Sequence, residues 1–228
     1  MQGNLKTTSS SLPDQKNFEL AYELAYKLAT ERLSSLPDLE EQCRKSDSVC
    51  YIDNSSRIVV LKYLNNIYQV SLPDISISVQ NRDEEIELRD KILILHYLTR
   101  AKGTPLSNRL IAYQELEEGA TYFPSFTQRA IKPLADYFGP HPERLVEFAA
   151  DLGGYKVNYG DVAVTIPAFS RVPITLVLWK EDTEFPPNAN VLFDSTILDY
   201  LPAEDVSVVC QTISWRLVRS LKRRSNTS

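Results

Sequence analysis

Apolar residues recur every three or four positions near both ends of the chain, which is the spacing of a helix that buries one face. The N-terminal stripe, in residues 17–36, consists of Phe18, Ala21, Ala25, Leu28 and Leu33 and is widened by Leu20 and Leu24. The C-terminal stripe, after Pro202, consists of Val206, Val209, Cys210, Ile213, Leu217 and Leu221. Both segments are predicted to be amphipathic helices, with Cys210 as a small core residue.

Residues 49–80 change from helical spacing to the composition of strands, with frequent Val, Ile and Tyr. Two such runs flank Asn65-Asn66, and asparagine tolerates the positive φ that a tight turn requires. Residues 75–79 alternate between apolar and polar positions. This part of the chain is predicted to form a small antiparallel sheet.

The rest of the chain alternates between the two periods. Helices are predicted in residues 83–102, 125–139 and 141–154, and strands in residues 109–113, 155–169 and 171–179. The helix 125–139 is expected to kink or restart at Pro133, and Pro173 indicates an edge strand or a first strand position. His96 lies beside the apolar stripe of its helix, which favours a packed, hydrogen-bonded histidine over a metal ligand.

The predicted strands cluster in the sequence and do not alternate strictly with helices. This order favours an α+β fold with antiparallel or mixed sheets and flanking helices over a doubly wound fold. The chain has no internal repeat and no long linker, so residues 17–222 are predicted to form a single domain. Residues 1–16 are predicted to be a disordered N-terminal tail, because they are polar and Ser-rich, and residues 223–228 a frayed C-terminal tail.

The distribution of charge along the chain is uneven, and one segment near the C-terminus is strongly basic. The net charge of −5 argues against general nucleic-acid binding, which requires a basic face. Residues 215–224 nevertheless hold five basic residues and no acid, whereas residues 171–205 hold two basic and seven acidic residues. The basic run has two interpretations: it attracts an anionic partner, or it places cations at a helix C-terminus, where the macrodipole favours them.

Cysteine and histidine are too sparse for a metal centre. Cys43, Cys50 and Cys210 fit no disulfide framework, and with His96 and His141 they offer no set of four zinc ligands. The sparse cysteines indicate a reducing compartment. The N-terminus is unlike a secretory signal, and no apolar run is long enough to span a membrane. A cytoplasmic protein is therefore expected.

The common catalytic signatures are absent from the sequence. It contains no phosphate-binding P-loop, no G-x-G-x-x-G and no G-x-S-x-G nucleophile elbow. Carboxylates in loop-like or loop-edge contexts remain as candidates for acid–base chemistry: Glu115, Asp182, Glu184 and Asp194. Sequence alone does not show whether any two of them converge on a substrate.

Two segments carry more aromatic and directed polar side chains than a core demands. The candidate ligand-binding residues of segment 109–129 are Arg109, Tyr113, Glu115, Tyr122, Phe123, Phe126 and Arg129. Those of segment 178–194 (LWKEDTEFPPNANVLFD) are Trp179, Phe185, Asn190 and Asp194. Aromatic walls with a few polar groups are typical of small-ligand pockets, and arginine can bind a carboxylate or phosphate in bidentate fashion. The alternative is that these aromatics seal loops onto the sheet.

Two longer blocks carry a resemblance to a known family. Residues 104–139 and 172–206 resemble the central and C-terminal motifs of the domain of unknown function 3786 family: a small residue with Pro-Leu, a strand, a RELPGG-like turn and a YYPAF-like stretch, then Trp, acid, Phe-Pro-Pro, Ala-Asn and Leu-Phe-Asp. The resemblance covers roughly residues 17–215. Gln114 stands where the family often has Arg, so no role for a cation is implied there.

The resemblance implies a protein of bacteria or archaea, largely anaerobes, but no activity. Some relatives carry a cysteine-rich segment suggestive of iron–sulfur binding, which three scattered cysteines do not provide. Three functions are therefore considered. The first is a non-catalytic binding or accessory protein of anaerobic metabolism, for a small or flat cofactor such as a tetrapyrrole, corrinoid or pterin. The second is a protein-interaction or metalloenzyme-assembly factor, and the third a carboxylate-based enzyme that uses Glu115 and Asp194.

Overall fold

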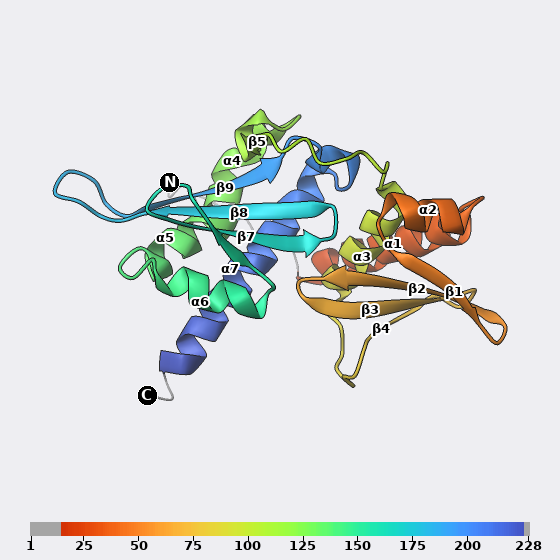
Figure 1. The fold of residues 1–228 in the computed structure, drawn as a ribbon. Helices are drawn as coiled ribbons and strands as arrows, with labels where there is room; N and C mark the ends of the chain where they lie inside the picture. Colours follow the sequence, from red (N-terminus) through yellow and green to blue (C-terminus); the bar gives the residue numbers. More distant parts are fainter. Residues whose placement is uncertain (1–14, 226–228) are drawn as a thin grey trace, which may run out of the picture.

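The computed structural model describes residues 15–225, with side chains described for residues 20–224. Its strands form one nine-stranded sheet in the order β4-β3-β2-β7-β8-β9-β5, with β1 beside β2 and β6 beside β7 (Figure 1). The paired strands are antiparallel throughout. Helices flank the sheet, so the predicted α+β single-domain fold is confirmed, with an antiparallel sheet.

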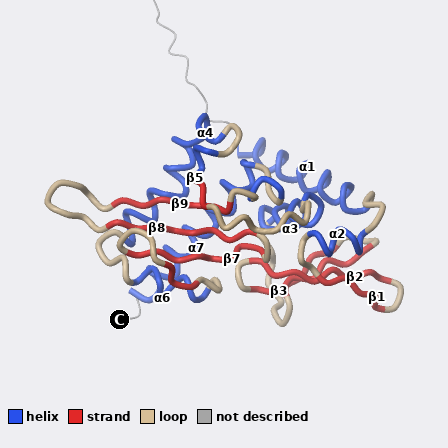
Figure 2. Tube along the Cα trace, turned by 45° about the horizontal axis from the view of Figure 1, so that its top comes forward, coloured by secondary structure: helices blue, strands red, loops and turns tan. Residues whose placement is uncertain are grey.

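The first half of the sheet is covered by N-terminal helices. Its strands are β1 (Val49–Asp53), β2 (Ser56–Tyr63), β3 (Asn66–Leu72) and β4 (Ser76–Val79), and its helices are α1 (Gln15–Ser34), α2 (Leu39–Lys45) and α3 (Leu88–Arg100). Figure 2 shows α1 and α3 side by side on one side of these strands. Strand alternation explains the packing: Val59, Leu61 and Tyr63 of β2 are buried, whereas Lys62 between them is exposed.

The second half contains the long C-terminal helix. Its strands are β5 (Leu110–Ala112), β6 (Tyr155–Val157), β7 (Val162–Phe169), β8 (Val172–Trp179) and β9 (Asn188–Asp194). Its helices are α4 (Gly119–Phe126), α5 (Lys132–Phe138), α6 (Arg144–Asp151) and α7 (Ala203–Ser225), with short turns at Tyr113–Glu115 (η1), Thr127–Ile131 (η2) and Ile197–Asp199 (η3). In Figure 1, α7 crosses behind the strands β7, β8 and β9.

The two halves of the sheet meet at one point. Tyr63 of β2 pairs with Phe169 of β7, and the N–H of Leu64 donates to the carbonyl of Ala168 at 2.9 Å. The rings of Tyr63 and Phe169 stack with centroids 4.7 Å apart, and Phe169 stacks in turn on Tyr97 of α3 at 4.2 Å. Because so few backbone bonds join the halves, side-chain packing has to hold them together.

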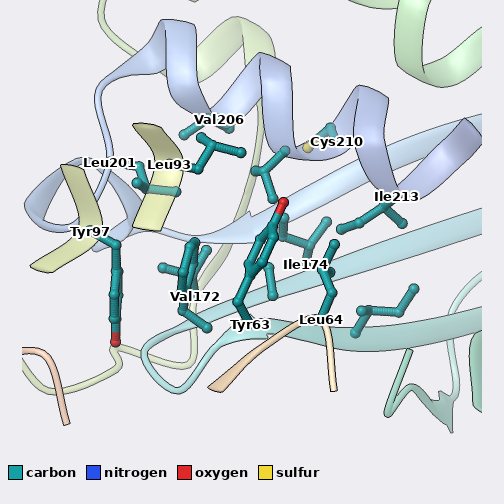
Figure 3. Packing of buried hydrophobic residues seen from close by; sticks show 14 of the residues in the cluster. Tyr63, Leu64, Leu93, Tyr97, Val172, Ile174, Leu201, Val206, Cys210 and Ile213 are labelled. Atoms are coloured by element: carbon teal, nitrogen blue, oxygen red, sulfur yellow. The ribbon is translucent and has the colours of Figure 1, made fainter. Parts of the chain in front are cut away.

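That packing lies between the strands and α7. Figure 3 shows Tyr63 and Leu64 gathered with Leu93 of α3, Ile174 of β8 and Ile213 of α7. All five side chains are fully or almost fully buried. The apolar stripe predicted for the C-terminal helix is confirmed, because each of its members is buried in this core.

Several local predictions need correction. The turn between β2 and β3 uses Leu64 and Asn65, with φ of 43° and 66°, instead of Asn65-Asn66. A leucine occupies this unfavourable backbone region because its side chain is buried in the junction core. The helix predicted from residue 83 begins at Leu88. Strand β8 is an interior strand, so Pro173 does not mark an edge, but it lies at the start of the strand, one residue after Val172, close to the alternative prediction.

The apolar face of α1 is only partly buried. Ala29 and Leu33 are covered, but Leu20, Leu24 and Leu28 are between 56% and 61% exposed, contrary to the predicted stripe. The reason is that α1 packs mainly against a single neighbour, α3, which covers one side of the helix.

The helices at the two ends extend beyond the boundaries of the predicted domain, residues 17 and 222. Helix α1 begins at Gln15, and residues 1–14 of the predicted tail lie outside the described residues. Helix α7 continues to Ser225, and residues 226–228 again lie outside the description. The last turns of α7 are tied to α6, because Arg224 pairs with Glu147 and Asp151. None of the helices in residues 15–225 has the length and apolar character needed to cross a membrane.

Candidate functional site

The aromatic residues of segment 109–129 are used largely for packing. Tyr113 and Phe126 are buried and stack with ring centroids 4.0 Å apart, and both meet Phe193 edge-on. Phe123 is half-buried next to Phe126. The hydroxyl of Tyr113 donates to the carbonyl of Ala203 at 3.2 Å, which ties the segment to the start of α7. This part of the predicted site forms a continuous aromatic core.

The polar members of the same segment lie on the surface. Arg109, Tyr122 and Arg129 are exposed. The carboxylate of Glu115 accepts the backbone N–H of Ala112 at 2.7 Å and thereby closes the turn η1. Its role in the structure is to hold the backbone of this turn.

Segment 178–194 is a hairpin loop followed by strand β9. Trp179 ends β8 and is 39% exposed, and Phe185 in the loop is 66% exposed. Asn190 lies within β9, and its side-chain oxygen accepts the N–H of Val191 at 2.8 Å. Asp194 ends β9 and is buried. The loop is anchored by Pro187, which packs against Gly139 at the end of α5. The two residues lie so close that a Cβ atom at Gly139 would clash with Pro187.

The two segments meet at only one end of β9. Strand β5 pairs with β9 so that Leu110 faces Asp194, while Trp179 pairs with Asn188 at the other end. Seven strand residues span about 20 Å, so Trp179 and Phe185 lie far from Arg109. The structure therefore brings Tyr113, Phe126 and Asp194 into one region and leaves the hairpin tip apart from it.

A cavity of about 230 Å³ lies elsewhere, between the start of α3 and the middle of α7. We call it the α3–α7 cleft. It is lined by Glu87, Arg89, Asp90, Gln211, Thr212, Trp215, Arg216 and Arg219, and by none of the residues predicted for the ligand site. Since α3 belongs to the first half of the molecule and α7 to the second, the cleft lies at their junction.

A buried hydrogen-bond network forms the floor of the cleft. Asp90 is buried, and its two carboxylate oxygens accept from the Tyr63 hydroxyl at 2.9 Å and from the Arg216 guanidinium at 2.6 Å. Arg216 also bonds Tyr68 and lies 5.7 Å from the centroid of the Tyr63 ring. Burial, followed by the Asp90 carboxylate, raises the pKa of Tyr63 well above its ordinary value, so this hydroxyl remains a donor. The network fixes Arg216 at the junction of the two halves.

The rim of the cleft carries excess positive charge. Three arginines stand against two carboxylates in the lining. Arg216 is paired with Asp90, and Arg89 with Glu87 at 2.7 Å. Among the described residues Arg219 has no carboxylate partner within ion-pair distance. The hydrogen bond from Arg89, with smaller effects of Arg219 and Arg216, holds the pKa of Glu87 below its usual value.

The other lining groups suit recognition of a small organic molecule. Trp215 is half-buried and offers an aromatic face, while Gln211 and Thr212 supply polar groups that can donate or accept. A shallower groove of about 470 Å³ adjoins the cleft through Glu87 and Arg89 and is otherwise lined by Tyr22, Glu23 and Leu88. Together the cleft and the adjoining groove provide a charged end and a partly apolar end.

No metal centre is found in the part of the chain that the structure describes. No three His, Cys, Asp or Glu side chains in it come together as potential ligands. The two histidines make separate contacts: His96 lies 2.7 Å from Asp205, and His141 lies 3.6 Å from Glu143. The interpretation of His96 as a packed, hydrogen-bonded histidine is confirmed by its short contact with Asp205.

The sequence contained a weak signal for the cleft. Thr212, Trp215, Arg216 and Arg219 follow the spacing of one helix face, within and just before the basic run 215–224. This face could have been distinguished in the sequence from the cations of the last helical turn, because it lies closer to the middle of the helix. The partners on α3 could not have been identified, since their approach depends on the tertiary fold.

Comparison with known proteins gives one match. The sequence model of a protein family described as domain of unknown function (DUF3786) matches residues 38–216. No curated protein and no solved structure matches the chain. The matched range includes α3, most of α7 and therefore all but one of the residues that line the cleft, the exception being Arg219.

Proposed function

The chain belongs to the family of the domain of unknown function DUF3786, and from this starting point we propose that it is a non-catalytic protein that binds a small organic anion in the α3–α7 cleft. The observation that carries the proposal is Arg219, a cation in the cleft wall without an ion-pair partner among the described residues. Arg89 and Arg216 each already have a carboxylate partner. A ligand carboxylate or phosphate bound next to Arg219 would give this third arginine an anionic partner as well.

The size and lining of the cleft narrow the range of possible ligands. A volume of about 230 Å³ is below the range of pockets for drug-sized molecules, so the ligand is smaller than a tetrapyrrole or corrinoid. A planar group next to the anion would pack against Trp215. An apolar extension would follow the adjoining groove toward Tyr22 and Leu88. We therefore propose a small planar acid as the ligand class.

The metabolic role and the cellular compartment of the protein are proposed on other grounds. The resemblance implies a role in anaerobic metabolism, and the three cysteines, all free thiols in the structure, support a reducing compartment such as the cytoplasm. The carboxylate-enzyme alternative receives less support, because Glu115 and Asp194 both bind backbone N–H groups and neither lines the cleft.

Benzoate and benzamide are suitable probes, because they share a planar shape and differ in charge. We expect benzoate to raise the melting temperature of the full chain and benzamide to have little effect. Replacing Arg219 with glutamine should weaken benzoate binding about tenfold, equivalent to about 1.4 kcal/mol. Isothermal titration calorimetry and thermal unfolding measure both effects.

Arg109 provides the matched control. It is an exposed arginine that the sequence placed in a different candidate site. Arg109→Gln should leave benzoate binding unchanged if the α3–α7 cleft is the site. Loss of binding in Arg109→Gln but not in Arg219→Gln would move the site to segment 109–129. Unchanged melting with benzoate, phosphate and other small acids would contradict the proposal, since a ligand at 100 times its Kd adds about 2.7 kcal/mol.

Protein interaction is a second candidate, favoured by the hairpin tip. Phe185 is 66% exposed, yet its backbone is held: the Asp182 carboxylate accepts the N–H groups of Glu184 and Phe185, each at 2.8 Å. A fixed exposed aromatic residue next to Glu181, Asp182 and Glu184 suits a partner protein with an apolar pocket and a basic rim.

Phe185→Ser tests this candidate. We expect it to abolish a complex that the unmodified chain recovers from native lysate, while the fold is retained because Phe185 makes few buried contacts. Tyr122→Ser is the control, because Tyr122 is 56% exposed on α4, away from the hairpin tip. Equal recovery of partners by Phe185→Ser and the unmodified chain would argue against the tip as an interaction surface.

A further inference from the structure

Helix α1 has two apolar faces, and only one of them packs on the rest of the molecule. Ala29 and Leu33 are buried, and the main neighbour of the helix is α3. Leu20, Leu24 and Leu28 are 61%, 57% and 56% exposed. Since a helix turns by about 100° per residue, Ala29 and Leu33 lie about 140° and 180° around the helix from Leu24. The exposed leucines therefore form a second apolar face, on the opposite side of the helix from the buried one.

The three exposed leucines form one row, which we call the α1 stripe. They are four positions apart, so each lies one helical turn beyond the last, and the row is about 12 Å long. Figure 2 shows α1 at the outside of the molecule, beside α3. A single exposed leucine is ordinary on a protein surface, whereas a row of them on one helix face is the pattern by which a helix docks on a partner.

The side chains next to the α1 stripe indicate what this partner is. Glu23 and Lys27 are exposed and lie on the same flank of the stripe, about 100° and 60° around the helix from Leu24. On the opposite flank, Leu24 has Ala21 and Ala25 beside it. One flank thus presents both signs of charge, one helical turn apart, and is complementary to itself when it runs in the opposite direction.

We propose that the α1 stripe is covered by a second copy of this chain, in an antiparallel pair of α1 helices with a two-fold axis at Leu24. Leu24 then meets the partner's Leu24, and Leu20 meets the partner's Leu28. The axis makes the interface isologous, so every contact occurs twice.

The charges favour the antiparallel arrangement. A two-fold axis perpendicular to the helices places the charged flank of one helix against the same flank of the other. Glu23 therefore faces the partner's Lys27, and Lys27 faces the partner's Glu23, which gives two ion pairs of opposite charge. In a parallel pair, the charged flank would face Ala21 and Ala25 instead, and these pairs would not form.

The interface is small, and it is separate from the proposed ligand site. A row about 12 Å long covers much less than a standard interface of about 1,600 Å², so the dimer is weak and reversible. None of the three leucines lines the α3–α7 cleft or the adjoining groove, although Glu23 borders the groove. Loss of the dimer would therefore leave the proposal of anion binding in place.

Sedimentation velocity of the full chain measures the association. We expect a monomer of 25.9 kDa at low concentration. A growing share of a species of twice this mass should appear up to about 500 µM, as for a Kd on the order of 100 µM. Leu24→Gln places a polar group at the two-fold axis and should raise the Kd about tenfold or more. Ile52→Gln is the matched control, because Ile52 is 74% exposed on β1, and it should leave the Kd unchanged.

Charge reversal tests the arrangement of the two helices. Glu23→Lys and Lys27→Glu should each raise the Kd about fivefold, because each brings like charges together across the interface. The chain that carries both substitutions should dimerise like the unmodified chain, because the antiparallel pair restores opposite charges. Circular dichroism checks that all variants retain the helix content of the unmodified chain.

Three results would overturn the proposal. The first is a chain that remains monomeric at about 500 µM, a concentration at which a dimer with a Kd on the order of 100 µM predominates. The second is a dimer whose Kd is the same in Leu24→Gln, or one that the double charge reversal weakens as much as each single reversal. The third is a monomer that binds phosphatidylglycerol vesicles through Leu24, which would assign the α1 stripe to a lipid surface.

Discussion

Replacing Asp90 with alanine is expected to lower the free energy of unfolding by about 3–5 kcal/mol, the usual cost of breaking a buried ion pair. The substitution leaves the Arg216 guanidinium and the Tyr63 hydroxyl without their shared acceptor at the junction of the two halves. It also removes a carboxylate from the first turn of α3, where the helix dipole favours it. Chemical denaturation followed by far-ultraviolet circular dichroism measures the loss.

Asp136→Ala is the matched control for this substitution. Asp136 pairs with Lys132 at 2.8 Å on the surface of α5, and both side chains are about half exposed. The loss there should be within about 1 kcal/mol, because exposed pairs are screened by solvent. Combining Asp90→Ala with Arg216→Met should recover part of the stability, since no buried charge is left unpaired. A loss at Asp90 as small as that at Asp136 would show that the network does not hold the junction.

Helices and strands with strong periodicity were predictable because one face of each is buried by the same core. The stripe of α7 was identified correctly, since Cys210 and Ile213 both lie in the packing between the sheet and α7. Helix α1 shows the limit of this argument. Its stripe has helical spacing, but of the predicted members Leu33 is buried, whereas Leu20, Leu24 and Leu28 are exposed.

Strand β9 was not predicted, for a physical reason. It contains Asn188 and Asn190, which have low β-propensity, and it follows a proline-rich loop. It is a strand because β8 pairs with Asn188 to Phe193 and β5 pairs with Leu192 to Asp194. Such non-local pairing is not visible in a window of sequence. Segment 178–194 is therefore a hairpin with a structured tip.

The cleft was not predicted because its two walls lie more than a hundred residues apart. Asp90 and Arg216 are separated by 126 positions. Each looked ordinary alone: an acid in the first turn of a helix, and one cation in a basic C-terminal run. Their common role at the junction follows only from the approach of α3 to α7, and it gives the anionic-partner interpretation of the basic run a specific location at Arg216 and Arg219.

The two sequence blocks that carry the family resemblance are joined by one side chain. The first block contains Ser107 and Asn108, and the second contains Asp194 and Thr196. Asp194 accepts the N–H of Ser107 at 3.1 Å, the N–H of Asn108 at 2.7 Å and the N–H of Thr196 at 3.0 Å. It also accepts both hydroxyls, from Ser107 at 2.9 Å and from Thr196 at 2.7 Å. The Leu-Phe-Asp motif therefore has a structural role at this position.

Asp194→Asn is accordingly expected to lower the free energy of unfolding at pH 7 by about 3 kcal/mol, because an amide NH₂ would face backbone N–H donors that a carboxylate accepts. Asp182→Asn is the matched control. That carboxylate also accepts two N–H groups, but in an exposed loop, so the loss should be much smaller. Urea denaturation of the two variants and the unmodified chain compares them directly.

The effect of Asp194 should also depend on pH. Burial acts to raise the pKa of Asp194, but the hydrogen bonds from Thr196 and Ser107 outweigh it and hold the pKa below its usual value. A group whose pKa is depressed by folding stabilises the protein above its unfolded pKa, about 3.9, and loses this contribution as the pH falls through the folded value. The difference in stability between the unmodified chain and Asp194→Asn should therefore be constant near neutral pH and shrink below about pH 4. A difference that persists at the lowest pH at which both fold would show that packing, and not the ionised carboxylate, joins the two blocks.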